Sequence, residues 1–336
     1  MIKKRVLLAD VAALAGLSKA TVSRYMNNSI VLPQETIARI ESAISQLDYR
    51  GNSLARRLSK GGSETLGLVL PDITNPFFAE LADAAEEAAF EHGYSLVLCI
   101  TRNNPEKESQ FIRWLDTCQV DGLLFTTNRP DNGLLRAEIQ RHQRIVLLDE
   151  DIPGSRVPKV FADNVQGGMI ATQQLIAAGH RQIAFIGGPD ELMSVRERYQ
   201  GFCTAMEQAG LHCPPEWVMY GKYQREFGQR ALRQLFSHHV RPTAVFAASD
   251  FLVLGLLDGL RELGLRAPAD LSLVGFDDAS YADFTQPRIS TIRQPARELG
   301  RTAVSLMLRL LNGEEDVPGE TRLPVTWIGR DSVQSR

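Results

Sequence analysis

Seven residues between positions 18 and 27 have side chains and a spacing suited to contact with nucleic acid. They are Ser18, Lys19, Ala20, Thr21, Ser23, Arg24 and Asn27. Arginine and asparagine can hydrogen-bond to base edges in the major groove, and small polar or basic side chains can contact phosphate oxygens. The spacing places these residues on the exposed side of a short helix, because Val22 and Met26 form an apolar face on the other side. The pattern therefore predicts a DNA-contacting helix.

A second short helix must precede this one and hold it in place. Val11, Leu14 and Ala15 recur at helical spacing and predict a buried face. Gly16 then ends that helix, since glycine adopts the left-handed turn without strain, and Ser18 can cap the next helix. Two short helices joined by a glycine turn form a helix-turn-helix motif. The alternative is an ordinary helical hairpin on a protein surface.

The distribution of charge favours the DNA-binding interpretation. The whole chain carries a net charge of −3 over 336 residues. Residues 1–62 contain ten Lys and Arg but only four Asp and Glu, so they carry +6 and the remainder carries −9. A basic module attached to an acidic body is typical of a DNA-binding head, because neutralised phosphates supply much of the affinity for DNA.

The length and composition limit the classes of protein to which this chain can belong. A length of 336 residues, with 44% hydrophobic and 23% charged residues, indicates a globular protein of two or three domains. The apolar runs are shorter than the roughly 20 residues that cross a membrane, and the basic N-terminus lacks the longer apolar run of a signal peptide. The four cysteines form no CxxC pair and the six histidines show no metal-ligand spacing. We therefore expect a cytoplasmic protein without a metal or cofactor.

Two further helices follow the helix-turn-helix. Residues 34–47 place Ile37, Ile40, Ile44 and Leu47 on one face, which can close a small three-helix core. Asn52 can cap a short basic helix, SLARRL, which ends before the flexible pair Gly61-Gly62. Because six or seven residues cannot hold a helix alone in water, this segment should fold only when it docks against something.

From residue 65 onward, strands and helices alternate. Short apolar runs predict strands at 66–70, 95–100, 122–126, 145–149, 183–188, 244–248 and 271–276. Helical stretches lie between them, at 77–92, 106–118, 166–178, 194–209, 226–237 and 252–263. This alternation indicates parallel sheets covered by helices on both faces, and its length suggests two α/β subdomains. Ligands in such folds bind at the carboxyl ends of the strands.

The chain contains, in order, DVAALAGLSKATVSRYMNN, NSLARRL, LPDITNPFF, VDGLLF, GHRQIAFIGGP, RYQGF, ASD at 248–250 and LVGFDD. Together these segments resemble the LacI/GalR family of transcriptional repressors, over about residues 8–332. The resemblance implies a homodimer, or a tetramer, that binds a pseudo-palindromic operator and a small-molecule effector. The absence of a heptad repeat after residue 330 favours the dimer.

The resemblance also implies a domain organisation. It consists of a helix-turn-helix head over residues 1–50, a hinge helix with its linker over 51–62, and a periplasmic-binding-protein-like core over 63–332. The core would contain two doubly wound parallel-sheet subdomains, one of about residues 63–163 and 293–322, the other of about 164–290 and 323–332. The chain would cross between them near Asp163, Ile289–Arg293 and Leu323.

Individual positions in the head match the family's DNA-binding residues. Lys19 and Ala20 fall at the leading recognition-helix positions, and Arg24 at the arginine further along that face. Ser18, Thr21, Ser23 and Asn27 match positions that contact the DNA backbone. In the hinge, Asn52 and Ala55 accompany Leu58, which matches the leucine that wedges into the minor groove and kinks the operator. Pro33 departs from the family's capping serine, and since proline cannot cap with a side chain, the start of the third helix is expected to shift by a residue.

Other positions match the family's effector pocket. Phe77 and Phe78 fall at its mouth, Arg198 at the arginine that grips the ligand, Asp277 at the aspartate that accepts sugar hydroxyls, and Tyr223 at a stacking aromatic. The remaining expected pocket residues are Thr126, Ser194, Arg196, Ser249 and Asp250. Ser249 replaces the asparagine common in sugar binders. With Arg196 as a second arginine, this suggests an acidic sugar such as gluconate or 2-ketogluconate.

Two other classes of protein compete with a regulator. An α/β enzyme is one, since such folds host many reactions, but the chain contains no GxGxxG after a strand, no GxxxxGK[ST] and no GxSxG. A sugar-binding protein for transport is the other, and it would have an export signal in place of a basic head. Both fit the sequence less well than a repressor controlled by a sugar or sugar acid.

Overall fold

A computed structural model describes residues 6–26, 29–49, 62–130 and 133–336. The protein divides after Glu64 into two compact units, an N-terminal head and a larger core. Each unit has its own hydrophobic centre.

The head contains three helices, α1 (Leu8–Ala15), α2 (Lys19–Met26) and α3 (Gln34–Gln46). Gly16 follows α1 with a φ of +66°, and Ser18 caps α2 by accepting a hydrogen bond from Thr21 N at 3.1 Å. Both features agree with the predicted helix-turn-helix. Pro33 occupies the cap position of α3, where its carbonyl accepts from Ile37 N, and α3 begins at the next residue.

The buried face of α1 differs from the expected one at two positions, because Ala12 takes the place expected for Leu14. Val11, Ala12 and Ala15 are buried, whereas Leu14 is 50% exposed. The expectation for Leu14 was wrong because the inward face of this two-turn helix is centred between Val11 and Ala12. Val22 of α2 and Ile40 of α3 complete the small core. The expected DNA contacts Asn27, Asn52, Ala55 and Leu58, and with them the hinge helix, lie outside the described residues.

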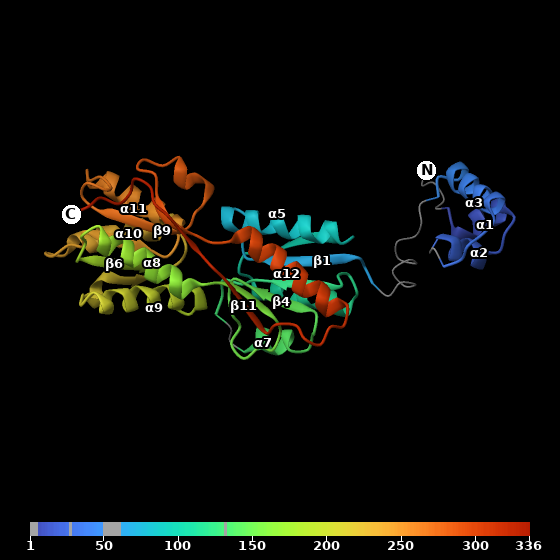
Figure 1. The fold of residues 1–336 in the computed structure, drawn as a ribbon, viewed down its shortest axis with the longest axis horizontal. Helices are drawn as coiled ribbons and strands as arrows, with labels where there is room; N and C mark the ends of the chain where they lie inside the picture. The colour runs from blue at the N-terminus through green and yellow to red at the C-terminus, as the bar shows by residue number, and fades with distance from the viewer. Residues whose placement is uncertain (1–5, 27–28, 50–61, 131–132) are drawn as a thin grey trace. The chain divides into compact units, whose positions relative to one another are not determined.

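Six parallel strands form the first sheet of the core (Figure 1). Their spatial order is β11 (Glu320–Leu323), β5 (Lys159–Ala162), β4 (Ile145–Leu148), β3 (Gly122–Phe125), β1 (Thr65–Leu70) and β2 (Ser95–Ile100). Helices α5 (Pro76–Glu91) and α12 (Ala296–Leu311) cover one face, and α6 (Pro105–Asp116) and α7 (Leu134–Ile139) the other. We call this unit the N-subdomain.

The second sheet also has six strands, of which β12 is antiparallel to its neighbour. Their order is β12 (Thr326–Ile328), β10 (Ser290–Arg293), β9 (Ser272–Asp277), β8 (Ala244–Ala247), β6 (Ile183–Gly187) and β7 (Val218–Tyr220). Helices α8 (Asn164–Ala177) and α9 (Met193–Gln208) cover one face, and α10 (Arg225–Ser237) and α11 (Asp250–Glu262) the other. We call this unit the C-subdomain.

The chain crosses between the subdomains three times. The crossings follow β5, β10 and β11, after Ala162, Arg293 and Leu323. The subdomain boundaries expected from the sequence, at residues 290–293 and 322–323, differ from these crossing points by up to three residues. The pairings explain the difference, since Arg293 is opposite Asp277 in the second sheet and Leu323 is opposite Ala162 in the first.

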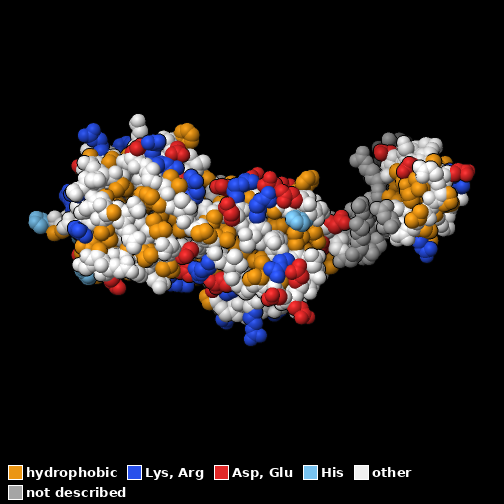
Figure 2. All heavy atoms as spheres, in the orientation of Figure 1, with side chains coloured by type: hydrophobic (Ala, Val, Ile, Leu, Met, Phe, Trp, Pro, Cys, Tyr) orange, Lys and Arg blue, Asp and Glu red, His pale blue; other side chains and the backbone are white. Residues whose placement is uncertain are grey.

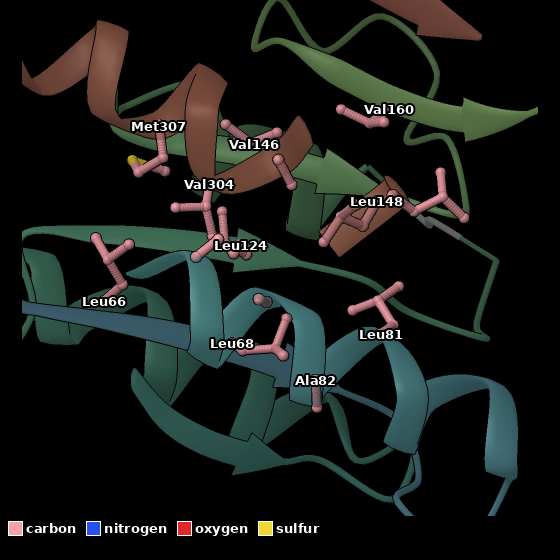
Figure 3. Packing of buried hydrophobic residues seen from close by; sticks show 14 of the residues in the cluster. Leu66, Leu68, Leu81, Ala82, Leu124, Val146, Leu148, Val160, Val304 and Met307 are labelled. Atoms are coloured by element: carbon pink, nitrogen blue, oxygen red, sulfur yellow. The ribbon is translucent and has the colours of Figure 1, made fainter. Parts of the chain in front are cut away.

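Buried aliphatic side chains fix the sheet against its helices. Figure 3 shows Leu66, Leu68 and Leu124 of the N-subdomain sheet facing Val304 and Met307 of α12 and Leu81 of α5. On the outer surface, ion pairs join the two helices, with Arg297 bound to Asp83 at 2.6 Å and to Glu87 at 2.8 Å. Figure 2 shows the interspersed charges on this surface. Such packing makes each subdomain a rigid support for the loops at its strand ends.

The loop between α8 and β6 contains a buried histidine. His180 is 1% exposed, and its ring nitrogens contact Thr243 Oγ1 at 2.8 Å and Gln334 O at 3.1 Å. It therefore anchors the C-terminal segment to the C-subdomain. No helix in the described residues is both long and apolar enough to cross a membrane.

Candidate functional site

The exposed face of α2 presents the predicted DNA-contacting residues. Lys19, Ala20 and Arg24 are exposed, and Thr21 and Ser23 are partly exposed. Ser18 is exposed as well, but its Oγ already caps α2 and lies 2.8 Å from Thr21 Oγ1. These two hydroxyls therefore help to begin the helix as well as facing solvent.

Two side chains of α3 hold the helix-turn-helix together. Arg39 Nη2 donates to the carbonyl oxygens of Ala15 at 2.5 Å and Gly16 at 3.3 Å, at the C-terminal end of α1. Glu41 Oε1 accepts a hydrogen bond of 2.9 Å from the Tyr25 hydroxyl of α2. The orientation of α2 thus depends on α3 at two points.

The core contains a cavity of about 830 Å³ that is lined by both subdomains. Its walls are the segments that follow the carboxyl ends of the strands. On the N-subdomain side these follow β1, β2, β3 and β4, and on the C-subdomain side they follow β6, β7, β8, β9 and β10. This is the expected location of a ligand site in parallel α/β sheets.

Seven of the ten residues expected at an effector pocket line this cavity. They are Phe77, Phe78, Ser194, Arg198, Tyr223, Ser249 and Asp277. The other three do not line it. Arg196 is exposed and its Nη1 donates to Glu191 O, whereas Thr126 and Asp250 are almost completely buried behind the wall.

Arg198 is fixed within the C-subdomain, although its charge faces the cavity. Its Nε donates to Asn164 Oδ1 at 2.8 Å and its Nη1 to Ala248 O at 2.7 Å. The guanidinium carbon lies 3.7 Å from the centre of the Phe276 ring, which permits a cation–π interaction. The carboxylate of Asp277 is 4.0 Å from Nη1. Arg198 is therefore a preorganised donor, and among the described residues its hydrogen bonds use Nε and Nη1 but not Nη2.

Neighbouring amide and hydroxyl groups hold the Asp277 carboxylate. Ser249 Oγ donates to Oδ2 at 2.9 Å, and Gln294 Nε2 donates to Oδ1 at 2.8 Å. Because the amide nitrogen of Gln294 faces this carboxylate, its Oε1 points elsewhere, and that atom is buried without a hydrogen-bond partner among the described residues. Burial raises the pKa of Asp277. Asp250 lies behind this group, bound to Thr291 Oγ1 and Ala279 N, rather than in the cavity.

Two acidic residues on the N-subdomain side face Arg198 across the cavity. Asp149 and Glu150 directly follow β4 and are 7% and 3% exposed. Burial raises the pKa of Asp149 to about 6, although Arg198 opposes the shift. Burial, followed by repulsion from Asp149, raises the pKa of Glu150 to about 8. Glu150 accepts hydrogen bonds from Ser194 Oγ and, at 3.3 Å, from Ser194 N.

Aromatic rings supply the apolar surface of the cavity. Asn75 caps α5 by accepting from Phe77 N at 3.1 Å, and this places Phe77 and Phe78 in the first turn beside the cavity. Their rings meet edge to face at 5.2 Å. Tyr223 lies on the opposite subdomain, and its buried hydroxyl has no hydrogen-bond partner among the described residues. Flat faces beside polar groups suit a ring that carries hydroxyls.

Sequence reasoning missed several residues that line the cavity. These are chiefly Asp149, Glu150, Asn128, Gln294, Arg102 and Arg129. Asp149 is the last residue of a predicted buried strand and Glu150 follows it, so their position at a strand's carboxyl end was a usable signal. Gln294 follows β10, a strand whose polar sequence gave no such signal. Among the described residues, no group of three His, Cys, Asp or Glu side chains is placed to hold a metal ion.

Comparison with known proteins gives consistent results for both units. The family of bacterial regulatory proteins, lacI family, matches residues 7–52. The family of periplasmic binding proteins and sugar binding domain of LacI family matches residues 63–331. The transcriptional repressor PurR of Proteus mirabilis is 36% identical over 312 residues, which cover 92% of each chain.

A second relative and a solved structure agree with these matches. The ribose operon repressor of Escherichia coli is 36% identical over 306 residues, covering 90% of this chain and 92% of the relative. The crystal structure of the Lac repressor dimer bound to operator and the anti-inducer ONPF superimposes with a TM-score of 0.88 at 27% identity. The match covers 99% of this chain and 100% of that one.

Proposed function

Because this chain belongs to the LacI family of bacterial regulatory proteins and is a DNA-binding transcriptional regulator, we propose that its 830 Å³ cavity binds the effector that controls operator affinity. The observation that supports this is the position of Arg198. Its guanidinium is buried and held by hydrogen bonds, and it lines a cavity whose polar residues come from both subdomains. The relatives of this chain are named as repressors, and we infer from operator binding that the protein acts in the cytoplasm.

We infer that the effector is a polyhydroxylated molecule of the sugar class. Asp149 and Glu150 supply hydrogen-bond acceptors, Arg198 supplies donors, and Phe77 and Tyr223 supply flat surfaces. Sugar hydroxyls can satisfy all of these groups at once. The family's description of this region as a sugar binding domain and the ribose repressor among its relatives support the same class.

The cavity favours a neutral sugar over gluconate or 2-ketogluconate. The acidic alternative depended on Arg196 beside Arg198, but Arg196 lies outside the cavity. The buried carboxyl groups of Asp149, Glu150 and Asp277 surround Arg198, and a carboxylate ligand would be repelled by those that are ionised. One observation supports a sugar acid, namely that the side chains of Arg102 and Lys222 also line the cavity.

Calorimetry on the full-length protein tests the site and the ligand class together. Matched pairs such as ribose with ribonate and glucose with gluconate separate a neutral sugar from an acid. We expect a neutral member to bind, and Arg198→Ala to lose at least about tenfold in affinity because a charge-assisted donor is removed. Arg196→Ala is the control. Arg196 lies on the same helix, two residues before Arg198, but outside the cavity, so this variant should bind as the parent does. Preferential binding of the acids, or equal losses in both variants, would contradict the proposal.

We also propose that Arg24 reads a base edge. Operator DNA selected from a random pool provides the ligand, and Arg24→Ala should weaken its binding by about 1–3 kcal/mol. Arg24→Lys is the matched control, since lysine keeps the charge but lacks the two-pronged guanidinium. If the lysine variant keeps both the affinity and the base preference, Arg24 contacts a phosphate instead.

The dimer expected of this family requires a self-complementary surface. Three large apolar side chains, Phe90, Val97 and Leu98, are exposed at the end of α5 and on β2, which is an edge strand of the N-subdomain sheet. We infer that they contribute to the dimer interface, because an uncovered apolar edge strand is otherwise a liability for aggregation.

A further inference from the structure

Two polar contacts cross from one subdomain to the other at the N-terminal turn of α9. Inside the cavity, Glu150 of the N-subdomain accepts hydrogen bonds from Ser194 N and Oγ. Outside the cavity, Arg322 of β11 binds Glu197 through two hydrogen bonds, Nη1 to Oε2 at 2.7 Å and Nη2 to Oε1 at 2.8 Å. Ser194 and Glu197 are three residues apart, so both contacts hold the same helical turn.

The partner of Glu197 is itself firmly attached to the N-subdomain. Arg322 Nε donates to Glu320 Oε1 at 2.7 Å within the same strand. Its guanidinium carbon lies 5.6 Å from the ring centre of Phe161, on the neighbouring strand β5. Glu197 is 16% and Arg322 33% exposed. A bidentate, partly buried pair with an oriented guanidinium is stronger than an ordinary surface ion pair.

Arg198 follows Glu197 directly in this turn. Because its hydrogen bonds to Asn164 and Ala248 O are within the C-subdomain, Arg198 moves with that subdomain. Its separation from Asp149 and the phenylalanines on the other side therefore depends on how the subdomains close. The two contacts that cross the gap on either side of Arg198 set that separation.

We propose that Glu197 and Arg322 are positioning residues of the cavity, whose ion pair acts with the Glu150–Ser194 contact to keep the subdomains closed around Arg198. The importance of this closure for effector binding rests on the function proposed above. The closure itself does not, because both contacts are formed by the protein alone. A ligand thus enters a cavity whose closed arrangement the protein already stabilises.

The backbone amide of Ser194 is a direct reporter of closure. It belongs to the first turn of α9, where an amide has no carbonyl partner within the helix. Its acceptor is Glu150 Oε2 on the opposite subdomain. Protection of this amide from hydrogen exchange therefore requires the two subdomains to be closed.

Hydrogen exchange on the full-length protein without ligand tests the proposal. We expect Glu197→Gln and Arg322→Gln each to accelerate exchange at Ser194 by about fivefold. The double variant Glu197→Arg with Arg322→Glu should restore the slow rate, because it rebuilds the pair with its charges exchanged. Glu314→Gln is the matched control, since it removes the partner of another arginine of the N-subdomain, Arg309, without touching the contacts between subdomains, and it should exchange as the parent does.

The results separate this proposal from its alternatives. Amides of β8, inside the C-subdomain sheet, report global stability and should exchange equally in all variants. Parental exchange at Ser194 in both single variants would overturn the proposal, as would a double variant that keeps slow β8 amides but does not recover at Ser194. If instead the pattern holds and no sugar binds, the closure stands and the proposed effector class is wrong.

Discussion

Three carboxyl groups near Arg198 have different partners, and their partners decide what each can do. Asp277 is held by Ser249 and Gln294, so most of its acceptor capacity is already used. Asp149 and Glu150 lie on the other subdomain, and Glu150 spans the cavity to Ser194. Their raised pKa values mean that ionising either one inside the folded protein costs free energy.

This cost makes stability depend on pH in a definite direction. The pKa of Glu150 is about 8 in the folded protein against 4.5 without its surroundings, so the folded state binds more protons between these values. The contribution of Glu150 to the free energy of unfolding must therefore fall as the pH rises from 4.5 to about 8 and level off above that. Glu150→Gln keeps one acceptor oxygen for Ser194 but cannot ionise. We expect this variant to gain stability relative to the parent as the pH rises.

Denaturant unfolding of both proteins across this pH range measures the difference. Asp149 contributes with the same sign between 3.8 and about 6, and because its charge also acts on Glu150, the comparison above about pH 6 isolates Glu150. A constant difference in unfolding free energy from pH 5 to pH 8 would show that Glu150 has an ordinary pKa in the folded protein.

At the scale of elements, the head depends on polar groups as much as on its small core. Arg39 places a cation at the C-terminal end of α1, where helix carbonyls carry partial negative charge. A methyl group at Gly16 would lie 2.7 Å from Arg39 Nη2, so glycine serves both the left-handed turn and the approach of this arginine. α3 therefore fixes the turn that presents α2.

Arg39→Met should loosen the helix-turn-helix while keeping the aliphatic part of the side chain. The loss of a charged hydrogen bond at an exposed site costs about 1 kcal/mol. Because the head is small, this loss of stability should raise the rate of hydrogen exchange in α1 and α2 and weaken operator binding. Glu35→Gln, an exposed residue in the first turn of α3, is the control and should have little effect on either measurement. Unchanged exchange in the Arg39 variant would assign the stability of the turn to the apolar core alone.

The elements that sequence predicted best are those with strong local patterns. The buried strands β1, β3, β4, β6 and β8 are continuous apolar runs, and α5 and α6 begin with capping asparagines before proline. Strand β11, with the sequence ETRL, was missed because an exposed edge strand has no apolar pattern. In the cavity, contacts between residues far apart in the sequence could not be predicted from local patterns either. The resemblance located Arg198 and Asp277, but only the fold shows that Glu150 meets Ser194 and that Arg196 points away.

At the scale of the whole molecule, operator recognition requires two heads at a fixed separation. A symmetric dimer places two recognition helices about one helical turn of DNA apart, so each half-site strengthens the binding of the other. Dimerisation and operator affinity are therefore coupled. The inferred interface, which includes Phe90, Val97 and Leu98, thus influences DNA binding although it belongs to the core.

Leu98→Glu tests this coupling. Leu98 is 47% exposed on β2, so a glutamate is tolerated in the folded monomer but places two buried charges near each other in a symmetric interface. We expect sedimentation velocity to show a dimer that dissociates at concentrations at least about tenfold higher than the parent requires. Operator affinity should fall in parallel and recover as the protein concentration rises. Val240→Glu changes a residue that is 55% exposed on the C-subdomain and should alter neither property. If Leu98→Glu remains as dimeric as the parent, another surface joins the subunits, and the exposed edge of β2 must be explained differently.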